Sequence, residues 1–266
     1  MSFRMICLDI DGTVLNTKNE ITEKTCTEIE RAMNKGMLVV FISARMPAGI
    51  TPIIAKLHTQ NVMACYGGAL IMENGIPAFD KTLSVSMSRR FCRTAKRLHV
   101  HASVYRHDSW IVEKSDYWSE QESAITGISP VTQHIPSVFR KWDSEGTGPN
   151  KLLFMAEANR IAELKGDLEA GPHGGTVLCR SKPTYLEIVP PSSNKQQAVA
   201  FLCERYGIQK DDVIAIGDSE NDIDMINYSG TGIAMGNAPD SVKSVADFVT
   251  LTNDEDGVAL AISKFL

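Results

Sequence analysis

The chain has 266 residues, a net charge of −5, and hydrophobic and charged fractions of 43% and 22%. Such a chain can bury the core of one large domain or two smaller ones. Its acidic balance supplies no basic field for a nucleic acid, and no apolar run approaches the roughly 18 residues of a membrane span. With no signal-peptide pattern and six scattered cysteines, we expect a reduced, cytoplasmic protein that binds neither nucleic acid nor membrane.

Short apolar runs alternate with helical patterns in the first part of the chain. The patterns predict strands over residues 5–8, 37–42 and 62–65, and helices over residues 22–35 and 47–60. Thr22 serves as an N-cap, Gly36 stops the first helix and Pro47 opens the second. This alternation favours a parallel sheet covered on both faces.

The pattern changes after about residue 82 and returns at Lys195. Between these points we predict one-faced strands over 102–105, 110–112, 152–155 and 185–188, with helices over 86–98 and 160–168. Later strands are predicted over 213–216, 232–235 and 248–249, between helices that begin at Lys195, after Asn221, near 241 and at Gly257. The predicted fold is α/β, with a Rossmann-like parallel-sheet core (residues 1–82 and 187–266) split by an inserted α+β domain (residues 83–186).

Two acidic runs follow buried strands. The first is Asp9-Ile10-Asp11-Gly12-Thr13 and the second is Gly217-Asp218-Ser219-Glu220-Asn221-Asp222. Open α/β folds collect ligands at the carboxyl edge of the sheet, where both runs are expected, and residues two apart on an extended chain point the same way. Clustered carboxylates favour a hard cation such as Mg²⁺. The alternatives are a turn formed by Asp and Gly, and a solvated acidic loop that caps a helix.

Two further signals are weaker. Ser43-Ala44-Arg45 follows the strand that ends at residue 42, where a hydroxyl and free N–H groups can hold phosphate oxygens, although Ser43 alone is more often a simple cap. Lys195 opens a helix; it is either a solvated lysine or an ammonium that orients a nucleophile and offsets phosphate charge.

Taken in order, these motifs resemble the haloacid dehalogenase superfamily, and within it the Cof-type sugar-phosphatase-like members with a type IIB cap. The resemblance extends to Gly67-Gly68-Ala69, to the segment from Gly232 to Ala238 and to Asp256-Gly257-Val258, and so covers nearly the whole core. It implies that residues 83–186 are a cap that selects the substrate.

The resemblance also implies a Mg²⁺-dependent phosphatase with Asp9 as nucleophile and Asp11 as general acid and base. Mg²⁺ would be held by Asp9, Asp218 and the backbone carbonyl of Asp11, with Asp222 behind them. Phosphate would be bound by the N–H groups of Ile10 and Ala44 and by the side chains of Ser43, Lys195 and Asn221. The substrate would be a small phosphorylated metabolite such as a sugar phosphate. The oligomeric state is open.

Three other functions are alternatives. A phosphomutase uses the same aspartyl-phosphate, and a non-catalytic sugar-phosphate sensor would share the pocket, although the intact Asp9, Asp11, Lys195 and Asp218 argue against a sensor. A dinucleotide-binding dehydrogenase fails because the glycines near Gly232 precede a strand. For His99, His101 and His107, surface or packing roles are favoured over a metal site because no acidic or cysteine partner stands at ligand spacing.

Overall fold

The computed structural model describes residues 3–57 and 62–266, which form two compact units. Unit 1 comprises Met1–Phe79 with Asn194–Leu266, and unit 2 is Asp80–Ser193. The second predicted boundary, at residue 186, falls inside strand β11 (Tyr185–Val189). Unit 2 therefore keeps the whole of β11, because this strand pairs with β9 (Lys151–Met155) in its own sheet.

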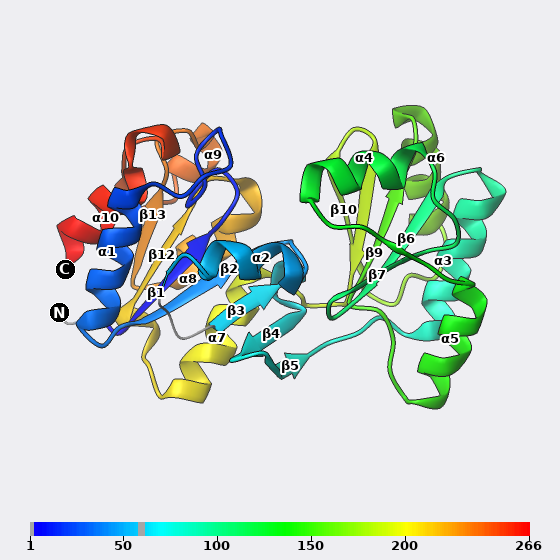
Figure 1. Ribbon diagram of the computed structural model, residues 1–266, viewed down its shortest axis with the longest axis horizontal. Coiled ribbons are helices and arrows are strands. Elements are labelled where there is room, and N and C mark those ends of the chain that lie inside the picture. Colours follow the sequence, from blue (N-terminus) through cyan, green and yellow to red (C-terminus); the bar gives the residue numbers. More distant parts are fainter. Residues whose placement is uncertain (1–2, 58–61) are drawn as a thin grey trace. The chain divides into compact units, whose positions relative to one another are not determined.

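Unit 1 is built on an eight-stranded sheet with the order β14-β13-β12-β1-β2-β3-β4-β5 (Figure 1). At its centre, β1 (Met5–Asp9) lies between β2 (Leu38–Ile42) and β12 (Val213–Gly217), and both pairings are parallel. β13 (Thr231–Ala234), β14 (Phe248–Val249) and β3 (Val62–Cys65) extend this parallel arrangement. The predicted α/β fold and its parallel core strands are confirmed.

The sheet is not parallel throughout, which corrects the expected topology. β4 (Leu70–Glu73) runs antiparallel to β3, and β5 (Ile76–Asp80) follows it at the edge. The turn between β4 and β5 is Asn74-Gly75, and both residues have positive φ. Asn-Gly is a strong hairpin signal, because these residues tolerate the left-handed backbone that a two-residue turn requires.

Helices bury the two faces of this sheet. Met5 and Cys7 of β1 pack in one cluster with Ala198 of α7 (Lys195–Tyr206) and Met225 of α8 (Ile223–Tyr228). Ile6, which alternates to the opposite face, is fully buried as well. α1 (Glu23–Asn34) and α10 (Gly257–Phe265) pack against each other (Figure 1). Short helices complete unit 1: η1 (Tyr66–Gly68), η2 (Lys210–Asp212), η3 (Glu220–Asp222), α9 (Asp240–Lys243) and η4 (Asn253–Glu255).

α2 (Pro47–Ile54) begins where Pro47 predicted, but it ends before the predicted residue 60. The last part of that prediction, residues 58–60, lies outside the described residues. α1 begins after Thr22, whose side chain accepts a hydrogen bond from the N–H of Thr25, so the predicted N-cap is confirmed.

Unit 2 contains a six-stranded sheet with the order β10-β11-β9-β6-β7-β8. Its remaining strands are β6 (His101–Arg106), β7 (Ser109–Val112), β8 (Val131–Thr132) and β10 (Val177–Lys182). All pairings are antiparallel except that of β7 with β8. α3 (Val85–Arg97), α5 (Ile135–Ser144) and α6 (Ala158–Glu169) bury one face of this sheet in a single apolar cluster.

α4 (Tyr117–Thr126) and α5 were not predicted from the sequence. α4 buries only Ser119, so no apolar stripe marks it, although Asp116 and Ser119 form a capping box at its start. α5 does carry a helical pattern, with Ile135, Val138, Phe139 and Trp142 all buried.

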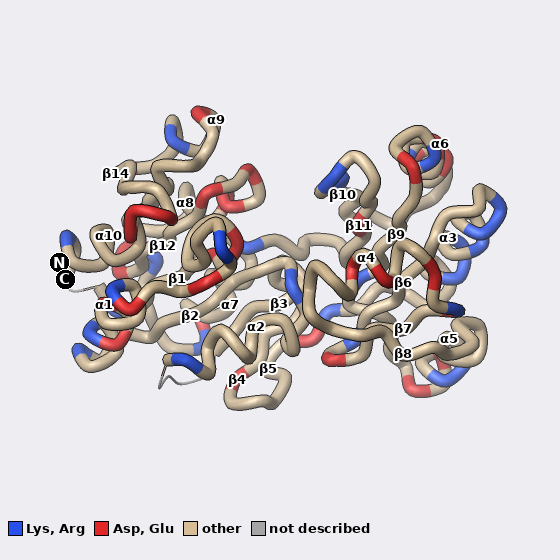
Figure 2. Tube along the Cα trace, turned by 45° about the horizontal axis from the view of Figure 1, so that its top comes forward, with Lys and Arg blue, Asp and Glu red and all other residues tan. Residues whose placement is uncertain are grey.

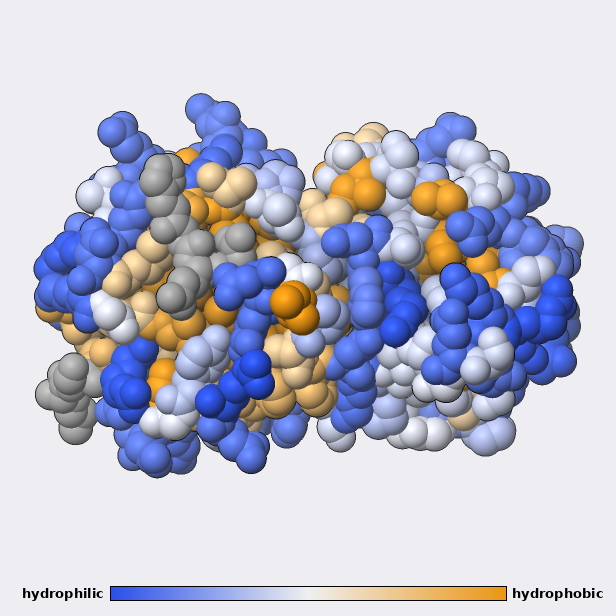
Figure 3. Space-filling view, turned by 60° about the horizontal axis from the view of Figure 1, so that its bottom comes forward, coloured by the Kyte–Doolittle hydropathy of each residue, from blue (hydrophilic) through white to orange (hydrophobic). Residues whose placement is uncertain are grey.

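Charged and apolar side chains are spread over both units. Lysine and arginine residues are scattered rather than gathered in one stripe (Figure 2). On the face shown in Figure 3, hydrophilic residues separate the apolar patches. None of the helices in the described part of the chain combines the length and apolar character that a membrane span needs.

Candidate active site

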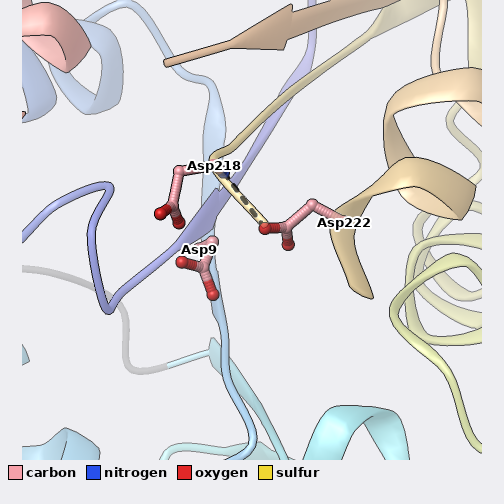
Figure 4. A group of neighbouring side chains, drawn as sticks. All are labelled: Asp9, Asp218 and Asp222. Carbon is pink, nitrogen blue, oxygen red and sulfur yellow. Dashed lines mark hydrogen bonds between the residues drawn. The ribbon is translucent and has the colours of Figure 1, made fainter. Parts of the chain in front are cut away.

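The carboxyl ends of β1, β2 and β12 bring the predicted site residues together in unit 1. Asp9 is the last residue of β1 and pairs in register with Ile42, directly before Ser43. Leu8 pairs with Ile216, two residues before Asp218. Figure 4 shows Asp9, Asp218 and Asp222 with their carboxylates turned toward one small region. Parallel register therefore converts three segments far apart in sequence into one site.

Lys195 provides the cation of this site. It is the first residue of α7, and its ammonium donates hydrogen bonds to Oδ1 of Asp9 and, at 2.5 Å, to Oδ1 of Asp222. The side chains of Asp9, Asp222 and Lys195 are 6%, 0% and 3% exposed, so both ion pairs are shielded from water. Such pairs are costly to break, because an unpaired buried charge is left behind.

Asp222 supports the loop that carries Asp218. Its Oδ2 accepts a hydrogen bond from the N–H of Asp218 at 3.1 Å (Figure 4). It accepts another from the N–H of Ser219 at 2.9 Å. Its Oδ1 is already bound to Lys195. A Cβ atom at Gly217 would lie 2.4 Å from Cγ of Asp222, so only glycine allows this close approach. Asp222 thus links Lys195 to the backbone around Asp218.

Negative charge outweighs positive charge at this edge of the sheet. Burial raises the pKa of Asp9 well above its usual value, Asp222 and Asp218 add to the shift, and Lys195 opposes it. Burial and the neighbouring Asp222 also raise the pKa of Asp218. Burial alone would lower the pKa of Lys195, but Asp9 and Asp222 raise it above its ordinary value. Three carboxylates share one ammonium, which favours the entry of a cation.

The donor set fits a divalent metal ion. Asp9, Asp218 and Asp222 each offer a carboxylate oxygen, and these oxygens lie within 4.8 Å of one another. Oδ2 of Asp9 is buried and accepts no hydrogen bond. Buried carboxylate oxygens are normally paired, and oxygen donors suit a hard cation. Within the described residues, this is the only such group of three or more histidine, cysteine, aspartate or glutamate side chains.

Comparison with known proteins identifies the family to which the chain belongs. A family model of haloacid dehalogenase-like hydrolases matches residues 6–262. The chain belongs to the haloacid dehalogenase-like hydrolases. It is 33% identical to a putative phosphatase of Haemophilus influenzae, over 99% of this chain and 98% of that protein. It is 30% identical to a 5-amino-6-(5-phospho-D-ribitylamino)uracil phosphatase of Bacillus subtilis, over 99% and 98%.

Comparison with solved structures gives the same family. The crystal structure of a haloacid dehalogenase-like hydrolase from Bacteroides thetaiotaomicron superposes with a TM-score of 0.91, at 29% identity and with 100% of both chains covered. The family resemblance inferred from the sequence motifs is therefore confirmed. Because these relatives are named as phosphatases, this haloacid dehalogenase-like hydrolase is an enzyme of the phosphatase type.

Asp11 lies apart from the buried carboxylates of this hydrolase. Its side chain is 52% exposed and is held by Arg45, which donates from Nε to Oδ2 at 2.9 Å and from Nη2 to Oδ1 at 2.5 Å. From the sequence, Arg45 was only a conceivable substrate contact at the end of the Ser43-Ala44-Arg45 motif, and its contact with Asp11 was not predicted. The available signal was its position two residues after Ser43, at the same sheet edge.

The remaining predicted residues line the ends of these strands. Ser43 is buried, and its Oγ accepts a hydrogen bond from the N–H of Arg45 at 3.1 Å, with Ala44 between them. Ile10 is buried directly after β1. Asn221 lies in η3, where its Oδ1 accepts a hydrogen bond from Oγ of Ser219 at 2.8 Å.

Two residues without a predicted role bind Asp218 directly. Oγ1 of Thr13 donates to Oδ1 of Asp218 at 3.1 Å. Nδ2 of Asn237 donates to the Gly12 carbonyl at 2.9 Å and to Oδ2 of Asp218 at 3.3 Å. Thr13 could have been identified from its place in the first acidic run. Asn237 follows β13, and only the sheet order brings it beside Asp218.

Two of the three histidines considered in the sequence, His101 and His107, have local partners. His101 hydrogen-bonds to Asp116 at 2.8 Å and to Ser103 at 3.0 Å. His107 hydrogen-bonds to Asp80 at 2.7 Å. His99 has positive φ just after α3. His101 and His107 therefore each have an acidic partner that the sequence spacing had not indicated, but among the described residues neither belongs to a group of three possible metal ligands.

Proposed function

We propose that this protein is a Mg²⁺-dependent phosphatase that hydrolyses small phosphorylated metabolites in the cytoplasm through an aspartyl-phosphate on Asp9. One observation carries the proposal. Asp9 is buried and oriented by Lys195 through Oδ1, its Oδ2 has no hydrogen bond, and a carboxylate oxygen of Asp218 lies within 4.8 Å of one of its own. A fixed carboxylate beside a cation site suits in-line attack on phosphorus.

In the first half-reaction, a carboxylate oxygen of Asp9 forms a bond to phosphorus as the bond to the leaving oxygen breaks. Asp11 gives its proton to that oxygen, and the alcohol departs. In the second half-reaction, Asp11 takes a proton from water, whose oxygen attacks phosphorus. The bond between Asp9 and phosphorus breaks, inorganic phosphate leaves, and both side chains return to their starting states.

Charge on the phosphoryl group requires several partners. Asp9, Asp218 and the carbonyl of Asp11 would hold Mg²⁺, which when bound neutralises phosphoryl oxygens. Lys195 orients Asp9 and offsets negative charge, and Ser43, Asn221 and the N–H groups of Ile10 and Ala44 receive the remaining oxygens. Asp222 keeps Lys195 and the Asp218 loop in place.

We assign unit 1 (Met1–Phe79 and Asn194–Leu266) to catalysis and unit 2 (Asp80–Ser193), which contains the predicted residues 83–186, to selection of the leaving group. The relative from Bacillus subtilis acts, by its name, on a phosphorylated ribityl compound. A sugar phosphate or a similar small phosphate ester is therefore the substrate class that we propose.

The test is release of inorganic phosphate from p-nitrophenyl phosphate with Mg²⁺, with EDTA, and without any bisphosphate. Turnover that needs Mg²⁺ but no bisphosphate supports a phosphatase over a phosphomutase. Asp9→Asn should abolish turnover and leave the circular dichroism spectrum unchanged. Asp143→Asn, at a side chain that is 63% exposed in unit 2, is the matched control. Turnover near that of the wild type in Asp9→Asn would exclude the proposed nucleophile.

A further inference from the structure

Arg45 holds Asp11 in a two-point fork that is anchored on its other side. Nε and Nη2 bind the two oxygens of Asp11, and Nη1 donates to the carbonyl of Gly49 at 3.1 Å. The backbone of Arg45 is also fixed, since its N–H donates to Oγ of Ser43. The guanidinium therefore has a set position at the sheet edge that carries Asp9.

While Asp11 is held in this fork, it cannot act as the general acid and base that we propose. Both oxygens of Asp11 face Arg45, whereas catalysis requires one of them to reach the leaving oxygen of the substrate. The carboxyl group must therefore turn out of the fork. Arg45 stays anchored by Gly49 and loses its bidentate acceptor, which leaves a partly buried cation without its counter-charge.

We propose that Arg45 is a specificity-determining residue that receives a second anionic group, a carboxylate or a phosphate, carried by the leaving group of the substrate. The inference rests on the proposed phosphatase function, which supplies the role of Asp11. A planar guanidinium matches these two anions because both present paired oxygens at the spacing of its N–H groups. Asp11 occupies that place as a carboxylate until the substrate arrives, and on leaving the fork it takes up from solvent the proton that it then gives to the leaving oxygen.

The charges around the site support an anionic partner for Arg45. Lys195 is already bound to Asp9 and Asp222, so its charge is shared between two buried carboxylates. Arg45 instead pairs with one half-exposed carboxylate that has to move. Exchange of one anion for another keeps Arg45 neutralised.

Two substrates of nearly equal size test this inference. At the end away from the phosphate ester, 3-phosphoglycerate carries a carboxylate, whereas glycerol 3-phosphate carries a hydroxymethyl group. We expect the wild type to favour 3-phosphoglycerate in kcat/KM by about tenfold or more, as for a hydrogen bond to a charged group. Arg45→Met should bring the ratio to within about twofold of unity, and Arg45→Lys should restore part of it, because it keeps the charge without the fork.

Arg205 provides a matched control in the same unit. It forms a similar fork with Glu73, from Nε to Oε1 at 2.6 Å and from Nη2 to Oε2 at 2.7 Å. Arg205→Met should leave the substrate ratio unchanged. An equal loss for both substrates in Arg45→Met would place Arg45 on the shared phosphoryl group and overturn the inference, as would a wild type without preference.

A binding measurement separates this inference from the proposed function. Calorimetry with Asp9→Asn should show tighter binding of 3-phosphoglycerate than of glycerol 3-phosphate, and the double variant Asp9→Asn, Arg45→Met should show no difference. Equal binding of the two esters by Asp9→Asn contradicts the inference. A wild type that fails to hydrolyse p-nitrophenyl phosphate contradicts only the proposed function, because binding still reports on Arg45.

Discussion

Lys195 binds Oδ1 of Asp9 and leaves Oδ2 of the same carboxylate without a hydrogen bond. The two residues are 186 positions apart in the chain. Their contact orients one oxygen through an ammonium; in the proposed mechanism the other oxygen is available to a cation or to a phosphorus atom. The same ammonium binds Asp222, so the stability and the chemistry of the site depend on one lysine.

Replacing Lys195 with methionine should therefore lower both the stability of the protein and its phosphatase activity. Two buried carboxylates lose their counter-charge, and we expect the free energy of unfolding to fall by about 3–5 kcal/mol. Turnover of p-nitrophenyl phosphate should fall by roughly 100-fold or more. Urea denaturation and the phosphatase assay measure the two effects. Lys165→Met, which removes a lysine from a partly exposed pair with Glu169, should change neither by much. Similar behaviour of the two variants would contradict this role of Lys195.

Gly12 is required for the contact between the two acidic loops. A Cβ atom there would lie 2.3 Å from Oδ2 of Asp218, and φ is +82°. Gly12→Ala should thus lower the free energy of unfolding by about 1–3 kcal/mol through strain and also reduce turnover by displacing Asp218. Gly36 has the same φ with nothing within 4 Å of its Cβ position, so Gly36→Ala isolates the strain. Loss of turnover in both variants to the same degree would argue against displacement of Asp218.

Mg²⁺ should stabilise the protein, because ions that bind only the folded state raise the unfolding temperature. We expect millimolar Mg²⁺ to raise Tm in the wild type and to have little effect on Asp218→Asn, which weakens one proposed ligand. Thermal unfolding with Mg²⁺ and with EDTA measures this difference. Asp240→Asn, at the start of α9, should keep the response of the wild type. A full response in Asp218→Asn would remove Asp218 from the metal site.

Unit 2 should lose stability in acid through Asp80. Burial alone would raise the pKa of this carboxyl, but hydrogen bonds from Asn150 and His107 hold it below its usual value. A depressed pKa stabilises the fold above the unfolded value, about 3.9, and this contribution is lost as pH falls through the folded value. Asp80→Asn should therefore lower the free energy of unfolding at pH 7, and this loss should become progressively smaller below about pH 4.

Urea denaturation of the wild type and Asp80→Asn across this pH range tests that expectation. The gap between the two proteins should narrow as pH falls. A constant gap would mean that the charge of Asp80 contributes nothing. Asp143→Asn, at an exposed position, should show no such trend.

Some of this site could be predicted because the signals are local. Apolar runs that end in Asp9 and Gly217 indicate buried strands, and parallel strands place their carboxyl ends at one edge. Asn74-Gly75 and the apolar stripe of α5 were local signals as well, which the sequence analysis did not use. α4 buries too few apolar side chains to be found by periodicity.

The sequence by itself determined the α/β core, the family and the two acidic loops, because strand periodicity and motif order depend on near neighbours. Only the tertiary structure decided that Lys195 bridges Asp9 and Asp222, that Arg45 holds Asp11 and that Asn237 reaches Asp218. These contacts depend on sheet order and on side-chain direction at separations of 19 to 186 residues. No local pattern encodes which charged groups meet there, because packing of the whole sheet fixes the distances.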